Sequence, residues 1–334
     1  MCAFRLAIAP RPRAGEVFDV IVVGAGPAGL TAALYSARFA LKTLVVSEDV
    51  GGALIDAGLV DDYLGLPSIR GPDLAKRFEG HVARYRVPVV RGRVVDVRRG
   101  NGLFTVVTEG GDLFRASTVV IAVGSRRRRL NVPGEREFTG KGVSYCAPCD
   151  APLFKDKVVA VVGGGNAALQ AALLLSSYSS KVYLVHRRNS FRAFPVYVKL
   201  VRESPNIEPI LNRVVIEIGG SRTVEWVRLR NVVSGEEEVV SVQGVVIEIG
   251  SEPPKEFFKR IGLQTDGSGY VVVKPGQLTN IPGIFAAGDC TAGPFKKKFD
   301  QIVVASAEGA IAALSAYEYL MERRGAKALA PGWG

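Results

Sequence analysis

Gly24-Ala25-Gly26-Pro27-Ala28-Gly29 follows an apolar, strand-like run at residues 19–23 and precedes a helical pattern at residues 30–39. In such a loop the first glycine makes a tight strand-to-helix turn, the second lets a pyrophosphate approach, and the third allows close helix packing. The free N–H groups and the positive dipole end of that helix attract phosphate. A second strand at residues 43–46 completes a βαβ unit, so this segment predicts a dinucleotide-binding fold.

The same pattern occurs again further along the chain. A strand is expected at residues 158–162, the loop is Gly163-Gly164-Gly165-Asn166-Ala167-Ala168, a helix runs to about 177, and a second strand occupies 181–185. Shorter β segments follow each unit, at 89–98, 103–108 and 112–123, and at 214–219, 223–232 and 237–250. These patterns predict an α/β protein with two Rossmann-like, three-layer ββα dinucleotide-binding domains. A strand at 270–273 and a helix at 302–323 are expected near the end.

The two halves differ where the ribose of a bound dinucleotide should lie. In the first half the second strand leads into Glu48 and Asp49, and either carboxylate can take ribose hydroxyls. In the second half the strand leads into His186-Arg187-Arg188 and then Arg192, without an acid. Arginines there can pair with a 2′-phosphate, which favours NADPH over NADH. The alternative is an exposed basic turn without a ligand.

Cys146-Ala147-Pro148-Cys149-Asp150 is a single Cys-x-x-Cys, which can close a small redox-active disulfide. Zinc needs about four ligands. The remaining candidates, Cys2, Cys290, His81 and His186, are widely scattered, so no metal site is predicted. Asp150 can act as general acid toward a departing thiolate. The alternative is that it caps a helix.

The composition excludes several functional classes. The formal net charge of +11 would suit an anionic partner, but no aromatic residues are interspersed in the arginine run at 126–129. We therefore expect a solvated loop there and no nucleic acid. No apolar run reaches the roughly 18 residues that span a bilayer, so no membrane association is expected. Arginines near the start make a poor signal peptide. The isolated cysteines suit a reducing compartment, namely the cytoplasm.

Five segments together carry a resemblance: GAGPAGL at 24–30, CAPCD at 146–150, VVGGGNAA at 161–168, VHRRNSFRA at 185–193 and PGIFAAGDC at 282–290. In this order they resemble low-molecular-weight bacterial and archaeal thioredoxin reductases, a type of FAD-dependent pyridine nucleotide-disulfide oxidoreductase, over nearly the whole chain. The resemblance implies an NADPH-binding domain at 125–251, carrying the cysteine pair. It would be inserted into a discontinuous FAD-binding domain at 1–124 and 252–334.

The resemblance also implies roles for individual residues. Cys149 would be the sulfur next to the flavin, Cys146 its partner and Asp150 the acid, while Asp289 would touch the FAD ribityl region. The FAD set comprises Gly24, Gly26, Pro27, Ala28, Gly29, Glu48, Asp49, Gly52, Asp62, Gly124, Gly288, Asp289, Gln301 and Ile302. The NADPH set comprises Gly163, Gly165, Asn166, Ala167, Ala168, His186, Arg187, Arg188 and Arg192. A homodimer and a domain rotation during turnover are implied as well.

The sequence departs from the family in three segments expected near the flavin. Ala53 stands where a glutamine usually follows the double glycine. Asp61-Asp62-Tyr63-Leu64-Gly65 replaces a common Glu-Asn-aromatic-Pro-Gly segment, and Asp300 stands where an arginine often precedes Gln301. These changes bear on the flavin contacts and leave the expected fold and disulfide unaffected.

The expected function is thioredoxin-disulfide reduction, with electrons passing from NADPH to FAD, to the Cys146–Cys149 disulfide and to a thioredoxin or similar redoxin. One alternative is a related flavoprotein that reduces another acceptor, either ferredoxin or the disulfide domain of a peroxidase. Ferredoxin-type relatives lack the cysteine pair, so its presence counts against that acceptor. A flavin-binding redox sensor or nucleic-acid-binding regulator is a further alternative, which rests only on the arginine run and the net charge.

Overall fold

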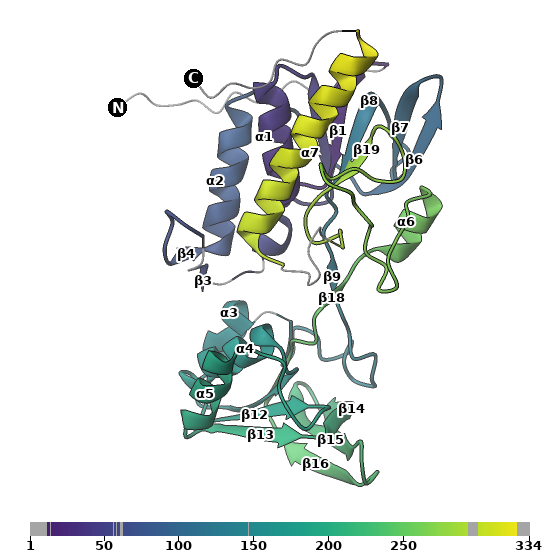
Figure 1. Ribbon diagram of the computed structural model, residues 1–334. Helices are drawn as coiled ribbons and strands as arrows, with labels where there is room; N and C mark the ends of the chain where they lie inside the picture. Colours follow the sequence, from purple (N-terminus) through teal and green to yellow (C-terminus); the bar gives the residue numbers. More distant parts are fainter. Residues whose placement is uncertain are drawn as a thin grey trace. The chain divides into compact units, whose positions relative to one another are not determined.

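The computed structural model describes residues 12–13, 15–55, 57, 59–60, 63–145, 147–292 and 300–325, except for the side chains of Leu59, Pro148 and Cys149. The chain divides into two compact units (Figure 1). One unit holds the chain up to Ile55, Leu59–Arg126 and the chain from Glu252 onward, and the other holds Arg127–Ser251. The short strands β9 (Arg126–Arg127) and β18 (Ser251–Glu252), where the chain passes between the units, pair with each other.

The first unit is built on a parallel sheet in which β1 lies between β2 and β8. Its strands are β1 (Val17–Val23), β2 (Thr43–Ser47), β5 (Val89–Arg91), β8 (Leu113–Ile121) and β19 (Ile284–Ala286), joined by the antiparallel pair β6 (Val94–Gly100) and β7 (Leu103–Thr108). Its other elements are α1 (Pro27–Arg38), η1 (Gly52–Leu54), β3 (Leu59–Val60), β4 (Ile69–Arg70), α2 (Gly71–Ala83), α6 (Lys255–Arg260) and α7 (Ile302–Arg323). Figure 1 shows α1, α2 and α7 side by side over one face of this sheet.

Strand β8 pairs with different strands along its two halves. Its first half pairs with the antiparallel strand β7, and its second half pairs with the parallel strand β19. Side chains of β1 alternate between the two faces, as the pleat requires. Val20 and Val22 pack with α1 and α7, whereas Ile21 packs on the opposite face with Phe104 and Phe258.

The second unit repeats this plan with a separate antiparallel sheet. Its parallel sheet has the order β10 (Val143–Ser144), β17 (Gly244–Ile247), β11 (Val158–Val162), β12 (Lys181–His186), β13 (Ile207–Leu211). Val159 and Val161 face the helices, and Ala160 and Val162 face the antiparallel sheet. The helices are α3 (Ala147–Asp150), η2 (Ala151–Phe154), α4 (Asn166–Ser176) and α5 (Pro195–Glu203). The antiparallel strands are β14 (Arg213–Gly220), β15 (Val224–Asn231) and β16 (Glu237–Ser241).

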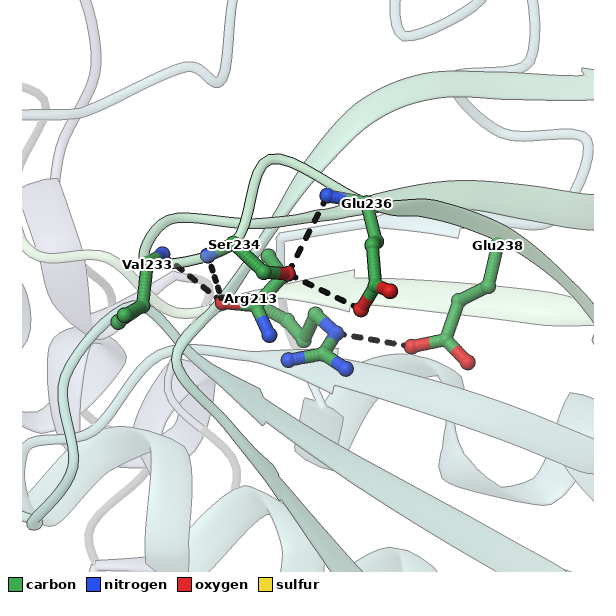
Figure 2. A network of polar contacts seen from close by, with 6 residues as sticks. Arg213, Val233, Ser234, Glu236 and Glu238 are labelled. Carbon is green, nitrogen blue, oxygen red and sulfur yellow. Dashed lines mark hydrogen bonds and ion pairs between the residues drawn. The ribbon is translucent and has the colours of Figure 1, made fainter.

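Exposed polar contacts close the turn between β15 and β16 (Figure 2). The Asn231 side-chain oxygen accepts hydrogen bonds from the N–H groups of Val233 and Ser234, and the Ser234 hydroxyl donates to Glu236. Arg213 on β14 pairs with Glu238 on β16 at 2.9 Å. These are local turn and cross-strand interactions, so this polar cluster has a structural role.

The predicted fold class is confirmed, and three predicted strands need correction. The run at 89–98 forms two strands, because Gly92 N–H bonds to Ser47 O at the end of β5 and the chain then enters the antiparallel pair. The run at 237–250 also divides, since its two halves join different sheets. Residues 270–273 form no strand, because Val271 makes only isolated bridges, to Thr265 and Thr291.

We expect the packing of α1 against α7 to be sensitive to a single methyl group at Gly309. A Cβ at this position would overlap the Ala28 carbonyl oxygen. Gly309→Ala should therefore destabilise the protein by about 1–3 kcal/mol through overpacking, although alanine in a helix normally stabilises by about 1 kcal/mol relative to glycine.

Gly80→Ala is the matched control, because Gly80 lies in α2 and a Cβ there meets no atom within 4 Å. The melting temperature should fall for Gly309→Ala and stay constant or rise for Gly80→Ala. Equal changes in melting temperature for the two variants would show that crowding at the α1–α7 contact does not lower stability.

Candidate functional site

The glycine turn after β1 is shaped by contacts that leave no room for side chains. Gly24 has φ +106°, and a Cβ there would overlap the Ala122 carbonyl oxygen. A Cβ at Gly29 would overlap the Gly24 carbonyl oxygen. Both glycines are therefore fixed by the turn itself, whereas Gly26 is in extended backbone and has only glycine backbone near it, at 3.9 Å from Gly52.

Several loops meet at the carboxyl ends of β1 and β2. Ala25 N–H donates to the Ser47 hydroxyl at 3.0 Å, and Gly51 N–H donates to the Ala25 carbonyl at 2.8 Å. Helix α1 begins at Pro27 without a side-chain cap, so the N–H groups of Ala28 and Gly29 have no partner within the helix. A phosphate-sized anion fits such a cradle.

Structural contacts distinguish the two candidate ribose carboxylates. Asp49 accepts a hydrogen bond from Gly52 N–H at 2.9 Å, so its carboxylate holds the loop. The Glu48 carboxylate is half-exposed and lies between Arg93 at 3.2 Å and Arg126 at 3.5 Å. Both carboxylates therefore have partners within the protein, and sequence reasoning did not identify the two arginines beside Glu48.

The remaining predicted FAD residues of the described chain lie after β8, after β19 and at the start of α7. Gly124 follows β8 with open space around it, and a Cβ at Gly288 would lie 2.8 Å from the Ala28 Cβ. Asp289 follows Gly288 directly, Gln301 precedes α7 and Ile302 begins it. Asp62 lies outside the described residues.

Glu308 holds the loop that contains Gly288 and was not identified from the sequence. This carboxylate is buried in α7 and accepts a hydrogen bond from Gly288 N–H at 2.6 Å. The Thr291 hydroxyl contacts the same oxygen at 3.3 Å. The sequence did contain a signal for Glu308, which is a lone acid in an otherwise apolar and small-residue stretch of the helix. An acid in such a stretch is expected to be buried, and a buried carboxylate needs partners.

The second glycine turn has the same construction around β11. Gly163 has φ +153°, and a Cβ there would overlap the Glu248 carbonyl oxygen. A Cβ at Gly165 would meet no atom within 4 Å, so this position leaves room for an approaching phosphate. Helix α4 starts at Asn166 without a side-chain cap, which leaves the N–H groups of its first turn, including Ala167 and Ala168, without helical partners. The Asn166 side chain accepts a hydrogen bond from Phe194 N–H at 2.7 Å and fastens the following loop.

His186 lies against this turn at the end of β12. A Cβ on Gly164 would overlap its imidazole, and Phe191 stacks on it with ring centroids 5.6 Å apart. The residue is 7% exposed, and its Nε2 has no hydrogen-bond partner within the described chain. Burial and the charge of Arg188 lower the pKa of His186, so the imidazole is neutral near pH 7. A buried polar atom without a partner, next to the Gly163–Gly165 turn, fits a ligand that supplies the missing hydrogen bond.

Arg187, Arg188 and Arg192 are exposed and follow His186 on one loop. No carboxylate among the described residues pairs with them. Arg192 N–H donates to the Gly164 carbonyl at 2.8 Å, which ties this basic loop to the glycine turn. The three guanidinium groups are therefore available to a phosphate bound beside the turn.

The Cys-x-x-Cys segment belongs to the unit of the second turn, and Ala147–Asp150 form α3. Cys146 and the side chain of Cys149 lie outside the described residues. Asp150 ends α3 and is partly buried, and it makes no side-chain cap to the following η2. The alternative of a helix cap therefore has no support in the geometry.

Two glutamates that sequence reasoning missed interact with residues next to this segment. The buried Glu135 accepts a hydrogen bond from the Tyr145 hydroxyl at 2.6 Å, and the Ala147 N–H favours the charged form of the partly buried Glu248. Neither belongs to the cysteine motif, so no local pattern indicated them.

In the described residues no group of three or more His, Cys, Asp or Glu side chains could hold a metal ion. None of the described helices is long and apolar enough to cross a membrane. Three arginines of the run at 126–129 interact within the protein: Arg126 with Glu48, Arg127 with Glu248, and Arg129 over the Tyr145 ring.

Comparison with known proteins identifies the family. The pattern of the pyridine nucleotide-disulphide oxidoreductases matches residues 18–309. Thioredoxin reductase from Listeria innocua is 38% identical over 309 residues, which are 92% of this chain and 95% of that protein. A component of alkyl hydroperoxide reductase from Pseudomonas putida is 38% identical over 317 residues, which are 94% of this chain but only 60% of that protein.

A solved structure extends the similarity to three dimensions. The chain is similar to thioredoxin reductase from Lactococcus lactis with a TM-score of 0.84 and 34% identity, covering 91% of this chain and 99% of that one. The chain belongs to the pyridine nucleotide-disulphide oxidoreductase family, as an FAD- and NADPH-dependent flavoprotein of the low-molecular-weight thioredoxin reductase type.

Proposed function

We propose that the protein is a thioredoxin-disulfide reductase, which passes reducing equivalents from NADPH through FAD to Cys146 and Cys149 and then to the disulfide of a thioredoxin or similar small redoxin. One observation carries the proposal. The chain holds two glycine turns, one followed by the acids Glu48 and Asp49 and the other by the arginines after His186, and a Cys-x-x-Cys belongs to the unit of the second turn. Similarity to a thioredoxin reductase along 95% of that protein's length supports it.

In this proposal FAD binds the unit with the Gly24 turn, made of 1–124 and 252–334, and NADPH binds the unit at 125–251. Glu48, which is half-exposed, takes the FAD ribose, whereas Asp49 holds the loop through Gly52 N–H. His186 and the three arginines take the adenosine end of NADPH. The neutral imidazole adds no charge there, and the arginines pair with the 2′-phosphate.

Bound FAD would carry two electrons from NADPH to the disulfide. Reduction of the Cys146–Cys149 bond takes up two electrons and two protons and yields two thiols. A thiolate then attacks the redoxin disulfide, and the other cysteine resolves the mixed disulfide. We assign Cys149 as the sulfur next to the flavin, Cys146 as its partner and Asp150 as the group that exchanges a proton with the departing thiolate.

A second acceptor is favoured by a specific similarity. The chain matches the alkyl hydroperoxide reductase component from Pseudomonas putida at 38% identity and spans 60% of its length. The disulfide domain of a peroxidase system is therefore the alternative substrate. Rates of reduction of a thioredoxin and of such a domain, measured side by side, decide between them.

We also propose that the protein is a homodimer in the cytoplasm. A sedimentation measurement tests the dimer, and cell fractionation tests the location.

Gly165→Ala should weaken NADPH binding without weakening the fold. A Cβ at Gly165 meets no protein atom within 4 Å and the backbone is extended, so the apoprotein has room for it. The methyl group would occupy the path of the pyrophosphate. We expect the KM for NADPH to rise at least tenfold while the melting temperature stays constant. An unchanged KM would place the pyrophosphate elsewhere.

Replacing Arg187 and Arg188 together by alanine should reduce the preference for NADPH over NADH. Each charge-assisted hydrogen bond contributes roughly 1.5–3 kcal/mol, so kcat/KM for NADPH should fall at least tenfold while that for NADH changes little. Arg202→Ala on α5 of the same unit is the control for general loss of charge. Equal use of the two nucleotides by wild type would show that this loop does not read the 2′-phosphate.

Cys149→Ser should abolish reduction of a redoxin disulfide, because no dithiol remains to resolve a mixed disulfide. NADPH should still bleach the flavin absorbance in this variant, since the nucleotide cradles are intact. Cys290→Ala is the control, because Cys290 is fully buried on the other unit. Full redoxin reduction by Cys149→Ser would mean that electrons leave by another route.

A further inference from the structure

The turn that contains Asp289 is held by a buried carboxylate of α7. Gly288, the residue before Asp289, has φ +80°, and its N–H donates to the Glu308 side chain at 2.6 Å. The Thr291 hydroxyl lies 3.3 Å from the same oxygen, and Thr291 N–H donates to the Gly288 carbonyl at 2.9 Å. Glu308 therefore closes, from inside the unit, a four-residue turn in which Asp289 is the second residue.

The same part of α7 touches the start of α1. A Cβ on Gly288 would lie 2.8 Å from the Ala28 Cβ and 3.6 Å from the Ala305 Cβ. A Cβ on Gly309, the residue after Glu308, would overlap the Ala28 carbonyl oxygen. Three segments that we assign to FAD, namely the start of α1, the turn with Asp289 and the first part of α7, therefore pack against one another, and Glu308 hydrogen-bonds the second to the third.

A carboxylate is an unfavourable residue at this buried position unless hydrogen bonds replace its hydration. Glu308 is 6% exposed, and the other buried residues of α7 are alanine, glycine and leucine. The sheet holds the chain only up to Ala287, whose N–H donates to the Ile121 carbonyl at 2.9 Å. Glu308 holds the next peptide, so the acid continues the support of this loop beyond the sheet.

We propose that Glu308 is a positioning residue for FAD, which fixes the turn of Gly288 and thereby the place of Asp289 against the cofactor. The inference rests on the proposed function, because it requires that FAD binds this unit. Without the acceptor, the Gly288 N–H loses its partner and the turn is no longer closed from α7. FAD binding would then have to order the turn as well, and ordering a segment on binding lowers affinity.

The test measures the dissociation constant of FAD for the full-length protein, by ultrafiltration of FAD-loaded samples and absorbance of the free flavin. Glu308→Ala should raise this constant roughly tenfold or more, because a buried donor loses its acceptor. Glu308→Gln should stay within about threefold of wild type, since its amide oxygen still accepts from Gly288 N–H. Glu318→Ala is the matched control on the exposed side of the same helix and should leave the constant unchanged.

Two outcomes would overturn the inference. One is equal FAD affinity in wild type and Glu308→Ala, and the other is an equal loss of affinity in Glu308→Ala and Glu308→Gln. A purely structural role would lower the melting temperature and leave the FAD affinity of the folded protein unchanged, so the affinity well below the unfolding transition decides.

Thr291→Val gives an independent measurement if Glu308→Ala does not fold. It removes the hydroxyl that contacts Glu308, so the dissociation constant of FAD should rise roughly threefold or more. An unchanged constant would contradict the inference. A wild-type protein that binds no FAD contradicts the proposed function, whereas tight FAD binding that neither substitution weakens contradicts only the role of Glu308.

Discussion

Both glycine turns depend on one steric constraint: the end of a neighbouring strand lies so close to the first glycine that no Cβ would fit. The Ala122 carbonyl meets Gly24 where a Cβ would stand, and the Glu248 carbonyl meets Gly163 in the same way. In each unit this contact lets the neighbouring strand lie beside the turn and directs the start of the following helix over the strand ends. Any larger residue would move the strand or the helix.

Local patterns were sufficient to predict the parts of the fold that local forces determine. The strands that precede each turn, the turns themselves and α7 (Ile302–Arg323) follow from apolar periodicity and glycine spacing. Glu48 and Asp49 could not be distinguished in this way, because the two acids are equivalent in a pattern. In the structure Asp49 accepts from Gly52 N–H, whereas Glu48 pairs with Arg93 and Arg126. Likewise, residues 270–273 have strand-like composition, but no neighbouring strand extends their pairing beyond single bridges.

Three glutamates show what sequence patterns leave undetected. Glu308 accepts from Gly288 N–H, and Glu135 accepts from Leu130 N–H and Asn131 N–H. The Ala147 N–H favours the charged form of Glu248. Leaving a buried backbone donor without a partner costs roughly 1–3 kcal/mol. Glu308 and Glu248 lie on elements far along the chain from the loops they hold, so only tertiary structure brings these partners together.

Glu248 holds the second glycine turn from the end of one strand. Its carbonyl packs against Gly163, its N–H donates to the Val162 carbonyl at 2.8 Å, and its carboxylate pairs with Arg127 at 3.3 Å. Since β17 fixes the backbone immediately before Glu248 in the sheet, a displacement of the glycine turn would be transmitted to this strand end. Rigid, close-packed interiors transmit displacements of this kind. The shape of the Gly163 turn therefore depends on a strand end far along the chain, which explains why glycine spacing alone does not define it.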